Sequence, residues 1–212
     1  MICIKNSEPS IFFARHSSAV IARNLLGHQV IYQGPQGLLS GLIVEDEAYG
    51  GANDSTSYAY QHRITKTSRP LYGNPGTMYI YTIHASYVFG IVDQPKGIPS
   101  GIMVRAIEPV HGKSIMIKNR QKSGVNLTNG PGKLMQALGI QDTTYNLKPC
   151  NREPLKIDLI HQRKPLFIST SARIGVSKGP NQNDRLRFYV TGNPYVSKMR
   201  KRDVRQDHGW QK

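Results

Sequence analysis

Three consecutive acidic residues, Glu45, Asp46 and Glu47, end an apolar run in the stretch VEDEAYGG, residues 44–51. If the chain is extended here, its side chains alternate, so Glu45 and Glu47 point to one face and Asp46 to the other. Tyr49 then shares the face of Glu47. A carboxylate beside an aromatic ring suits a site that holds a flat, electron-poor ring next to a general base. The alternative is a solvated turn that caps the strand.

A second chemically informative stretch contains two β-rich runs joined by residues 84–86. This pattern predicts a β-hairpin with His84 and Tyr87 near its tip. Tyr79 and Tyr81 share a face of the first run, a spacing more typical of packing on a sheet than of stacking on bases. In a basic protein, an aromatic hairpin is also suited to enter the minor groove of DNA as a wedge.

Both stretches need a sheet to position them, and the sequence predicts mixed helix and strand. One helix is expected over Ala19–Leu26, with Ser17 or Ser18 as its cap and Gly27 as its end. A second is expected over Pro131–Leu138, ended by Gly139. The expected strands are Gln29–Tyr32, Leu38–Glu45, Met78–Ile83, Tyr87–Val92, Ile102–Ile107, Leu166–Ser169 and Arg187–Val190.

These elements predict the α+β class. We expect a single compact domain over residues 1–197, built around a curved, mainly antiparallel sheet with flanking helices and a protruding β-hairpin. Residues 198–212 form a basic C-terminal tail, which we expect to fray or to lie on phosphate.

Charge points to a polyanionic partner. The 212 residues carry 28 Lys and Arg against 13 Asp and Glu, a formal net charge of +15. Such a protein gains affinity for nucleic acid by releasing counterions condensed on phosphates. The alternative is a ribosome-like or merely soluble basic protein.

Cysteine usage and the N-terminus bear on the compartment. Cys3 and Cys150 fit neither a disulfide framework nor the spacing of a zinc site, which favours a reducing compartment. The N-terminal stretch MICIKNSEPSIFF lacks the continuous apolar segment of a signal peptide or a membrane span. We therefore expect a cytoplasmic protein that has no membrane partner.

Six blocks in the chain occur in the order found in one enzyme family. They are VEDEAYGG, PGTMYIYTI, VRAIEP, NGPGKLMQALGI, ARIGV and LRFYVTGNPYVS. From about Leu25 to Ser197 the chain resembles the alkyladenine (3-methyladenine) DNA glycosylases, a type distinct from the helix-hairpin-helix glycosylases. The resemblance implies a bacterial monomer without metal or cofactor, associated with the nucleoid through DNA. It would flip damaged purines out of double-stranded DNA and cleave the N-glycosidic bond, leaving an abasic site.

The resemblance also assigns catalytic roles. Glu47 matches the general base that activates water, Arg105 matches an arginine that fixes this water, and the main-chain carbonyl of Ile174 matches a third water contact. The role of Glu47 fits the chemistry, since a carboxylate deprotonates water and stabilises an oxocarbenium-like transition state. Without the resemblance, Arg105 would be interpreted as a phosphate clamp or a surface salt bridge.

Base selection is assigned to aromatic residues. Tyr49 and Tyr81 match the rings that sandwich the extruded base, and an electron-rich ring face attracts a cationic purine. The resemblance places Ser57, Tyr58 and Ile91 in the same base pocket. It assigns the DNA wedge and the backbone contacts to His84, Tyr87, Leu71, Arg63, Thr65, Lys66 and Arg69.

Three of these positions depart from the family pattern. Tyr58 replaces a pocket histidine, His84 replaces a tyrosine wedge, and Ile91 replaces an asparagine that screens against the exocyclic amine of guanine. These departures predict an altered substrate preference. Two functions remain open: an active glycosylase for alkylated or deaminated purines, and a DNA-binding relative that has lost cleavage and recognises distorted DNA. The presence of Glu47 and Arg105 favours the first.

Overall fold

The strands and helices are seen in a computed structural model that describes residues 9–13 and 16–212. Cys3 and most of the N-terminal stretch interpreted above lie outside these residues. Cys150 is buried, and burial raises the pKa of its thiol to about 12. None of the helices in the described part of the chain has the length and apolar character needed to cross a membrane.

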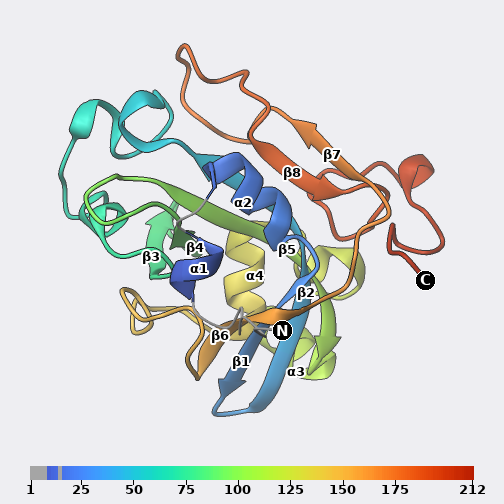
Figure 1. The fold of residues 1–212 in the computed structure, drawn as a ribbon. Coiled ribbons are helices and arrows are strands. Elements are labelled where there is room, and N and C mark those ends of the chain that lie inside the picture. Colours follow the sequence, from blue (N-terminus) through green and yellow to red (C-terminus); the bar gives the residue numbers. More distant parts are fainter. Residues whose placement is uncertain (1–8, 14–15) are drawn as a thin grey trace, which may run out of the picture.

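The architecture is an open antiparallel sheet of eight strands with flanking helices, which confirms the predicted α+β class (Figure 1). The strands are β1 (His28–Gly34), β2 (Gly37–Tyr49), β3 (Met78–Ile83), β4 (Ser86–Val92), β5 (Gly101–His111), β6 (Leu155–Gln162), β7 (Ile168–Ser171) and β8 (Arg187–Val190). The helices are α1 (Pro9–Phe12), α2 (Ser18–Leu25), α3 (Lys113–Arg120) and α4 (Pro131–Leu138), with short 3-10 turns at Gly51–Asn53, Tyr60–His62, Arg69–Tyr72, Gly124–Leu127 and Lys201–Asp203.

Strand β2 is the centre of the sheet. The strand order is β3-β4-β5-β2-β1-β6, and β8, which also pairs with β7, adds to β2 beyond the end of β1. The three acids therefore lie between β5 and β8, each paired on both sides of β2. They do not form a solvated turn, because the strand continues to Tyr49. The register against β5 shifts around Glu45, and such bulges commonly redirect side chains beside functional sites.

The helices bury their apolar faces against this sheet. Helix α2 packs on β2, β5 and β8 through the buried side chains of Ile21 and Leu25. Helix α4 packs on β4 and β5 through Leu134 and Leu138. The predicted end of α4 is confirmed, since Gly139 has φ +75° and its N–H bonds to carbonyls of the last turn.

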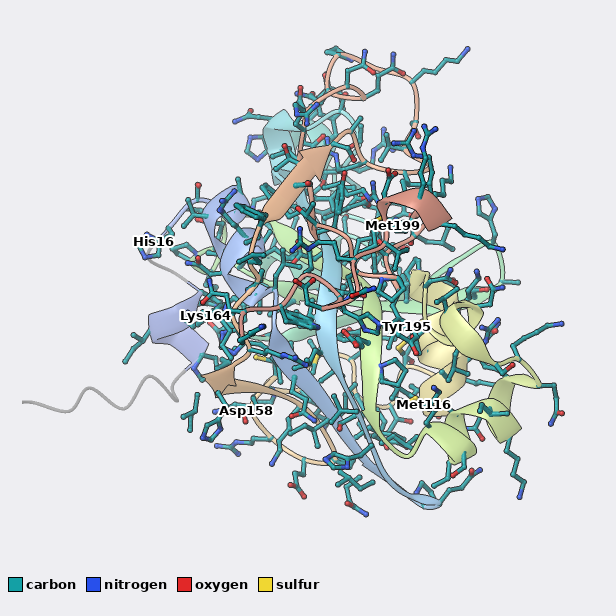
Figure 2. The ribbon with its side chains drawn as sticks, turned by 90° about the vertical axis from the view of Figure 1, so that its right-hand side faces the viewer. His16, Met116, Asp158, Lys164, Tyr195 and Met199 are labelled. Carbon is teal, nitrogen blue, oxygen red and sulfur yellow. The ribbon has the colours of Figure 1, made fainter. Side chains whose placement is uncertain are left out.

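The C-terminal tail is folded onto the body, so the expectation that it frays is wrong. Trp210 is 2% exposed, and its Nε1 donates to Oε2 of Glu108 at 2.7 Å. Tyr195 and Met199, labelled in Figure 2, both pack on the main core where the tail begins. Within the tail, Arg205 pairs with Asp207 at 2.9 Å. A tail that buries a tryptophan and pairs its own charges is a structural element of the domain.

Candidate active site

A buried ion-pair cluster joins β2 to β5. Nε of Arg105 lies 3.0 Å from Oε1 of Glu45, and its Nη1 lies 3.1 Å from Oε2 of Glu47. One arginine reaches both carboxylates because they project from the same face of β2, as strand alternation predicts. Both glutamate side chains are fully buried, and that of Arg105 is 8% exposed.

A second arginine completes the charge balance of this cluster. Nε of Arg187 lies 2.7 Å from Oε1 of Glu45, and the backbone N–H of Ser197 donates to Oε2 at 2.6 Å. Two carboxylates therefore face two guanidinium groups, which is how buried charges avoid a large desolvation penalty. Burial alone would lower the pKa of Arg105, but Glu47 and Glu45 hold it above its ordinary value. Arg105 thus stays cationic and fixes the position of Glu47.

Glu47 also accepts hydrogen bonds from two other parts of the chain. The hydroxyl of Tyr49 donates to Oε2 at 2.7 Å, and the backbone N–H of Ile174 donates to Oε1 at 2.8 Å. Burial, with Glu47 next to it, raises the pKa of Tyr49 well above its usual range, so the phenol keeps the proton that it donates. Ile174 therefore touches Glu47 through its backbone amide, while the water contact of its carbonyl stays a prediction.

A cavity of about 500 Å³ opens next to Tyr49. The predicted site residues on its wall are Tyr49, Ser57, Tyr58, Arg63, Leu71, Tyr81 and His84. Sequence reasoning missed other wall residues, among them Tyr60 and Met103. Glu47 itself has no exposed surface, so the hydroxyl of Tyr49 links the carboxylate to the cavity.

Tyrosine rings form a large part of the wall. The rings of Tyr79 and Tyr81 are stacked, with centroids 4.3 Å apart and planes 18° apart. Tyr58 meets Tyr81 edge to face at 5.5 Å and is 45% exposed. The shared face predicted for Tyr79 and Tyr81 is confirmed, but both rings line the cavity, so packing on the sheet is not their only role. Stacked tyrosines offer an electron-rich surface to a planar, cationic ring.

Ile91 lies elsewhere. It is fully buried in the main core, and its backbone pairs with Met78 and Ile102. Its neighbour Gly90 is on the cavity wall, because adjacent residues of a strand point to opposite faces. The prediction that Ile91 lies in the base pocket is therefore wrong. At this point the cavity wall is formed by Gly90, which has no side chain.

The hairpin between β3 and β4 is tighter than predicted. Ile83 pairs with Ser86, so only His84 and Ala85 form the loop, and their φ values are +46° and +61°. Two central residues with positive φ are typical of a type I′ turn, which normally contains Asn or Gly. His84 is exposed at the cavity, whereas Tyr87 lies on a separate, smaller depression with Arg120 and Met135.

The predicted backbone contacts lie on one braced segment beside the cavity. Arg63, Thr65, Lys66 and Arg69 are all exposed there. Buried Ser68 supports the segment: its hydroxyl donates to the carbonyl of Arg63 at 2.8 Å and accepts the N–H of Thr65 at 2.8 Å. Exposed basic side chains on a fixed segment are suited to phosphate contacts.

Two buried arginines of the site were not predicted, although each lies in a sequence block quoted above. Arg187 belongs to LRFYVTGNPYVS, and Arg173 belongs to ARIGV. Both are less than 9% exposed and both pair with buried carboxylates, Glu45 and Asp54. The sequence did contain a signal for them, namely an arginine within a short apolar block. An arginine buried among apolar residues requires a partner of opposite charge.

Comparison with known proteins identifies relatives over nearly the whole chain. Residues 11–194 match the family model described as methylpurine-DNA glycosylase (MPG). A protein of Latilactobacillus sakei named "Putative 3-methyladenine DNA glycosylase" is 49% identical over 205 residues, 95% of this chain and 96% of its own. Proteins with the same name from Listeria monocytogenes and Lactiplantibacillus plantarum are 43% and 41% identical, covering 92% and 94% of this chain and 94% and 96% of theirs.

Proposed function

Because this chain belongs to the methylpurine-DNA glycosylase family, and is therefore a hydrolase that acts on N-glycosyl bonds in DNA, we propose how its site performs the reaction. The protein flips alkylated or deaminated purines out of duplex DNA and hydrolyses the bond between base and sugar. It acts as a monomer, and the product is an abasic site in an uncut strand.

One observation carries this proposal. A fully buried carboxylate, Glu47, is joined by a 2.7 Å hydrogen bond to Tyr49 on the wall of a tyrosine-lined cavity. A flipped purine needs an aromatic pocket of this kind, and its C1′ carbon needs a base and a negative charge nearby. The net charge of +15 and the exposed basic segment at 63–69 support attraction to the DNA backbone.

The residues then have separate tasks. Glu47 takes a proton from water through the Tyr49 hydroxyl, which passes its own proton to the carboxylate and accepts one from the water. The water oxygen bonds to C1′ as the C1′–N bond breaks, its electron pair leaving with the purine. The negative charge of Glu47 stabilises the oxocarbenium-like sugar, and Arg105 pairs with the carboxylate and fixes its orientation. A purine that is already cationic leaves without further protonation, so the site favours alkylated bases.

The test uses duplex oligonucleotides with one hypoxanthine or ethenoadenine, followed by alkali, which cuts the strand at abasic sites. We expect the wild-type protein to produce a cut at the lesion. Glu47→Gln should lower the single-turnover rate by on the order of 10² or more while lesion-DNA affinity is retained. The matched control is Glu153→Gln, which changes a glutamate whose side chain is 61% exposed.

The alternative function predicts another outcome. A relative that only recognises distorted DNA would bind lesion duplexes selectively and would yield no alkali-sensitive site with any purine lesion. Near-normal excision by Glu47→Gln would instead remove Glu47 as the base. Melting temperatures of both variants, measured in parallel, separate a lost proton acceptor from a lost fold.

A further inference from the structure

A buried ion pair lies behind the tyrosine wall. Nη2 of Arg173 lies 3.0 Å from Oδ1 of Asp54, and its Nη1 bonds to Oδ2. The side chain of Arg173 has no exposed surface, and that of Asp54 is 6% exposed. The Arg173 guanidinium covers the ring of Tyr49 at 4.8 Å from its centroid. Since Arg173 does not itself line the cavity, it covers the side of the ring that faces away from it.

This pair also ties together three segments of the cavity wall. Arg173 donates to the carbonyls of Ala48 at 2.9 Å and Asn181 at 3.1 Å. Asp54 accepts the N–H of Gly50 at 3.0 Å and bonds to Thr56. Burial alone would raise the pKa of Asp54, but its hydrogen bonds to Arg173 and Thr56 hold the pKa below the usual value. Both members of the pair are therefore ionised, and the positions of the ring and its backing charge are fixed.

We infer that the Arg173–Asp54 pair is a specificity determinant: by keeping the buried side of Tyr49 electrically neutral, it allows this site to accept cationic as well as neutral purines. The inference rests on the proposed function, in which the flipped base stacks on the open face of Tyr49. A base about 3.5 Å above the ring would lie roughly 8 Å from the guanidinium, close enough for an uncompensated charge to act through the protein. Asp54 cancels the positive charge, so a cationic purine is accepted.

Charge-changing substitutions should shift this preference in opposite directions. Asp54→Asn keeps the shape but leaves Arg173 uncompensated, which disfavours a cationic base. Arg173→Gln leaves Asp54 uncompensated, which favours one. The double variant restores neutrality. At an effective dielectric constant of about 20 and a separation of roughly 8 Å, the uncompensated charge of Arg173 corresponds to a change of about thirtyfold.

The experiment measures single-turnover excision of 7-methylguanine, which is cationic, and of hypoxanthine, which is neutral, in the same duplex sequence. The quantity compared is the ratio of the two rates, normalised to wild type. Changes in attraction to the DNA backbone or in overall folding affect both lesions and cancel in this ratio. We expect about a thirtyfold fall for Asp54→Asn, a rise of similar order for Arg173→Gln, and a ratio near wild type for the double variant.

Arg173→Lys is the conservative control, because it keeps the charge and should leave the ratio close to wild type. If Asp54→Asn does not fold, Arg173→Gln still tests the sign of the effect. Ratios that stay within twofold of wild type in the folded single variants would overturn the inference, even if both rates fall. A wild-type protein that excises neither lesion would instead overturn the proposed function on which the inference rests.

Discussion

Asp46, the middle acid of the triplet, should destabilise the protein at neutral pH. It is fully buried, and neither of its carboxylate oxygens has a hydrogen-bond partner among residues 9–13 and 16–212. It points away from Glu45 and Glu47, and its register partners are the buried residues Val104 and Phe188. Burial, with the two flanking glutamates, raises its pKa well above the ordinary value of 3.8.

The sign of the pH dependence follows from this raised pKa. Below about pH 4 the group is protonated in both folded and unfolded chains, so it causes no difference. As pH rises further, the unfolded chain releases the proton and the folded chain retains it. The free energy of unfolding then falls by about 1.4 kcal/mol per pH unit until the folded-state pKa is passed.

Asp46→Asn removes this ionisation with little change of shape. Its free energy of unfolding, measured by urea denaturation from pH 4 to pH 7, should match wild type at pH 4. The difference should then grow in favour of the variant with the slope given above. Asp46→Val also removes the unpartnered polar atoms, so it should add about 1–3 kcal/mol even at pH 4.

The exposed carboxylate Asp142 provides the control, since Asp142→Asn should leave the pH profile parallel to that of wild type. If the Asp46→Asn and wild-type profiles are also parallel from pH 4 to pH 7, Asp46 is ionised in the folded protein and the reasoning fails. A variant less stable than wild type at pH 7 would point to a partner for the carboxylate.

Three further perturbations test other parts of the fold. Glu45→Gln leaves two buried guanidinium groups facing one carboxylate, so the free energy of unfolding measured in urea should fall by about 3–5 kcal/mol. An unchanged midpoint of urea denaturation would mean that the cluster is hydrated. Ala85→Gly relieves a φ of +61° and should raise that free energy by about 1 kcal/mol, with Ala52→Gly, outside this turn, as the comparison. Trp210→Ala should cost about 3–5 kcal/mol, which a frayed tail would not show.

Local patterns predicted most of the elements. Met78–Ile83, Pro131–Leu138 and Arg187–Val190 have the predicted bounds, because periodicity and a terminal glycine or proline define them within the segment itself. Strand β6 was missed although its apolar residues Leu155, Ile157 and Leu159 alternate. Helix α3 offers a weaker signal, since most of its residues are polar or exposed.

The errors at the site come from contacts between distant segments. The strand that carries the acids was predicted to end at Glu45 because three acids are expected in water. They are buried because Arg105 and Arg187, 60 and 142 residues along the chain, supply opposite charges. The prediction of a frayed tail failed for the same reason. The basic composition of the tail predicts solvation, whereas Trp210 is buried and donates a hydrogen bond to Glu108. Neither partner is visible in a local pattern.

The triplet of acids is consistent with the basic composition of the protein once buried and exposed charges are separated. Glu45 and Glu47 face Arg105 and Arg187, and Asp54 faces Arg173, so these buried groups sum to zero. Asp46 and Asp93 are the other buried carboxylates among the described residues, and burial raises the pKa of both, which favours their neutral forms.

The excess of basic residues is therefore left to the rest of the molecule, where it attracts DNA from a distance. The pairing of the buried charges also matters for the proposed reaction. In the proposed mechanism, a flipped base in the cavity lies next to buried acidic groups whose charges are paired, including Glu47 with Arg105. In that mechanism positive charge develops on the sugar, and a single unpaired arginine in the buried cluster would oppose it.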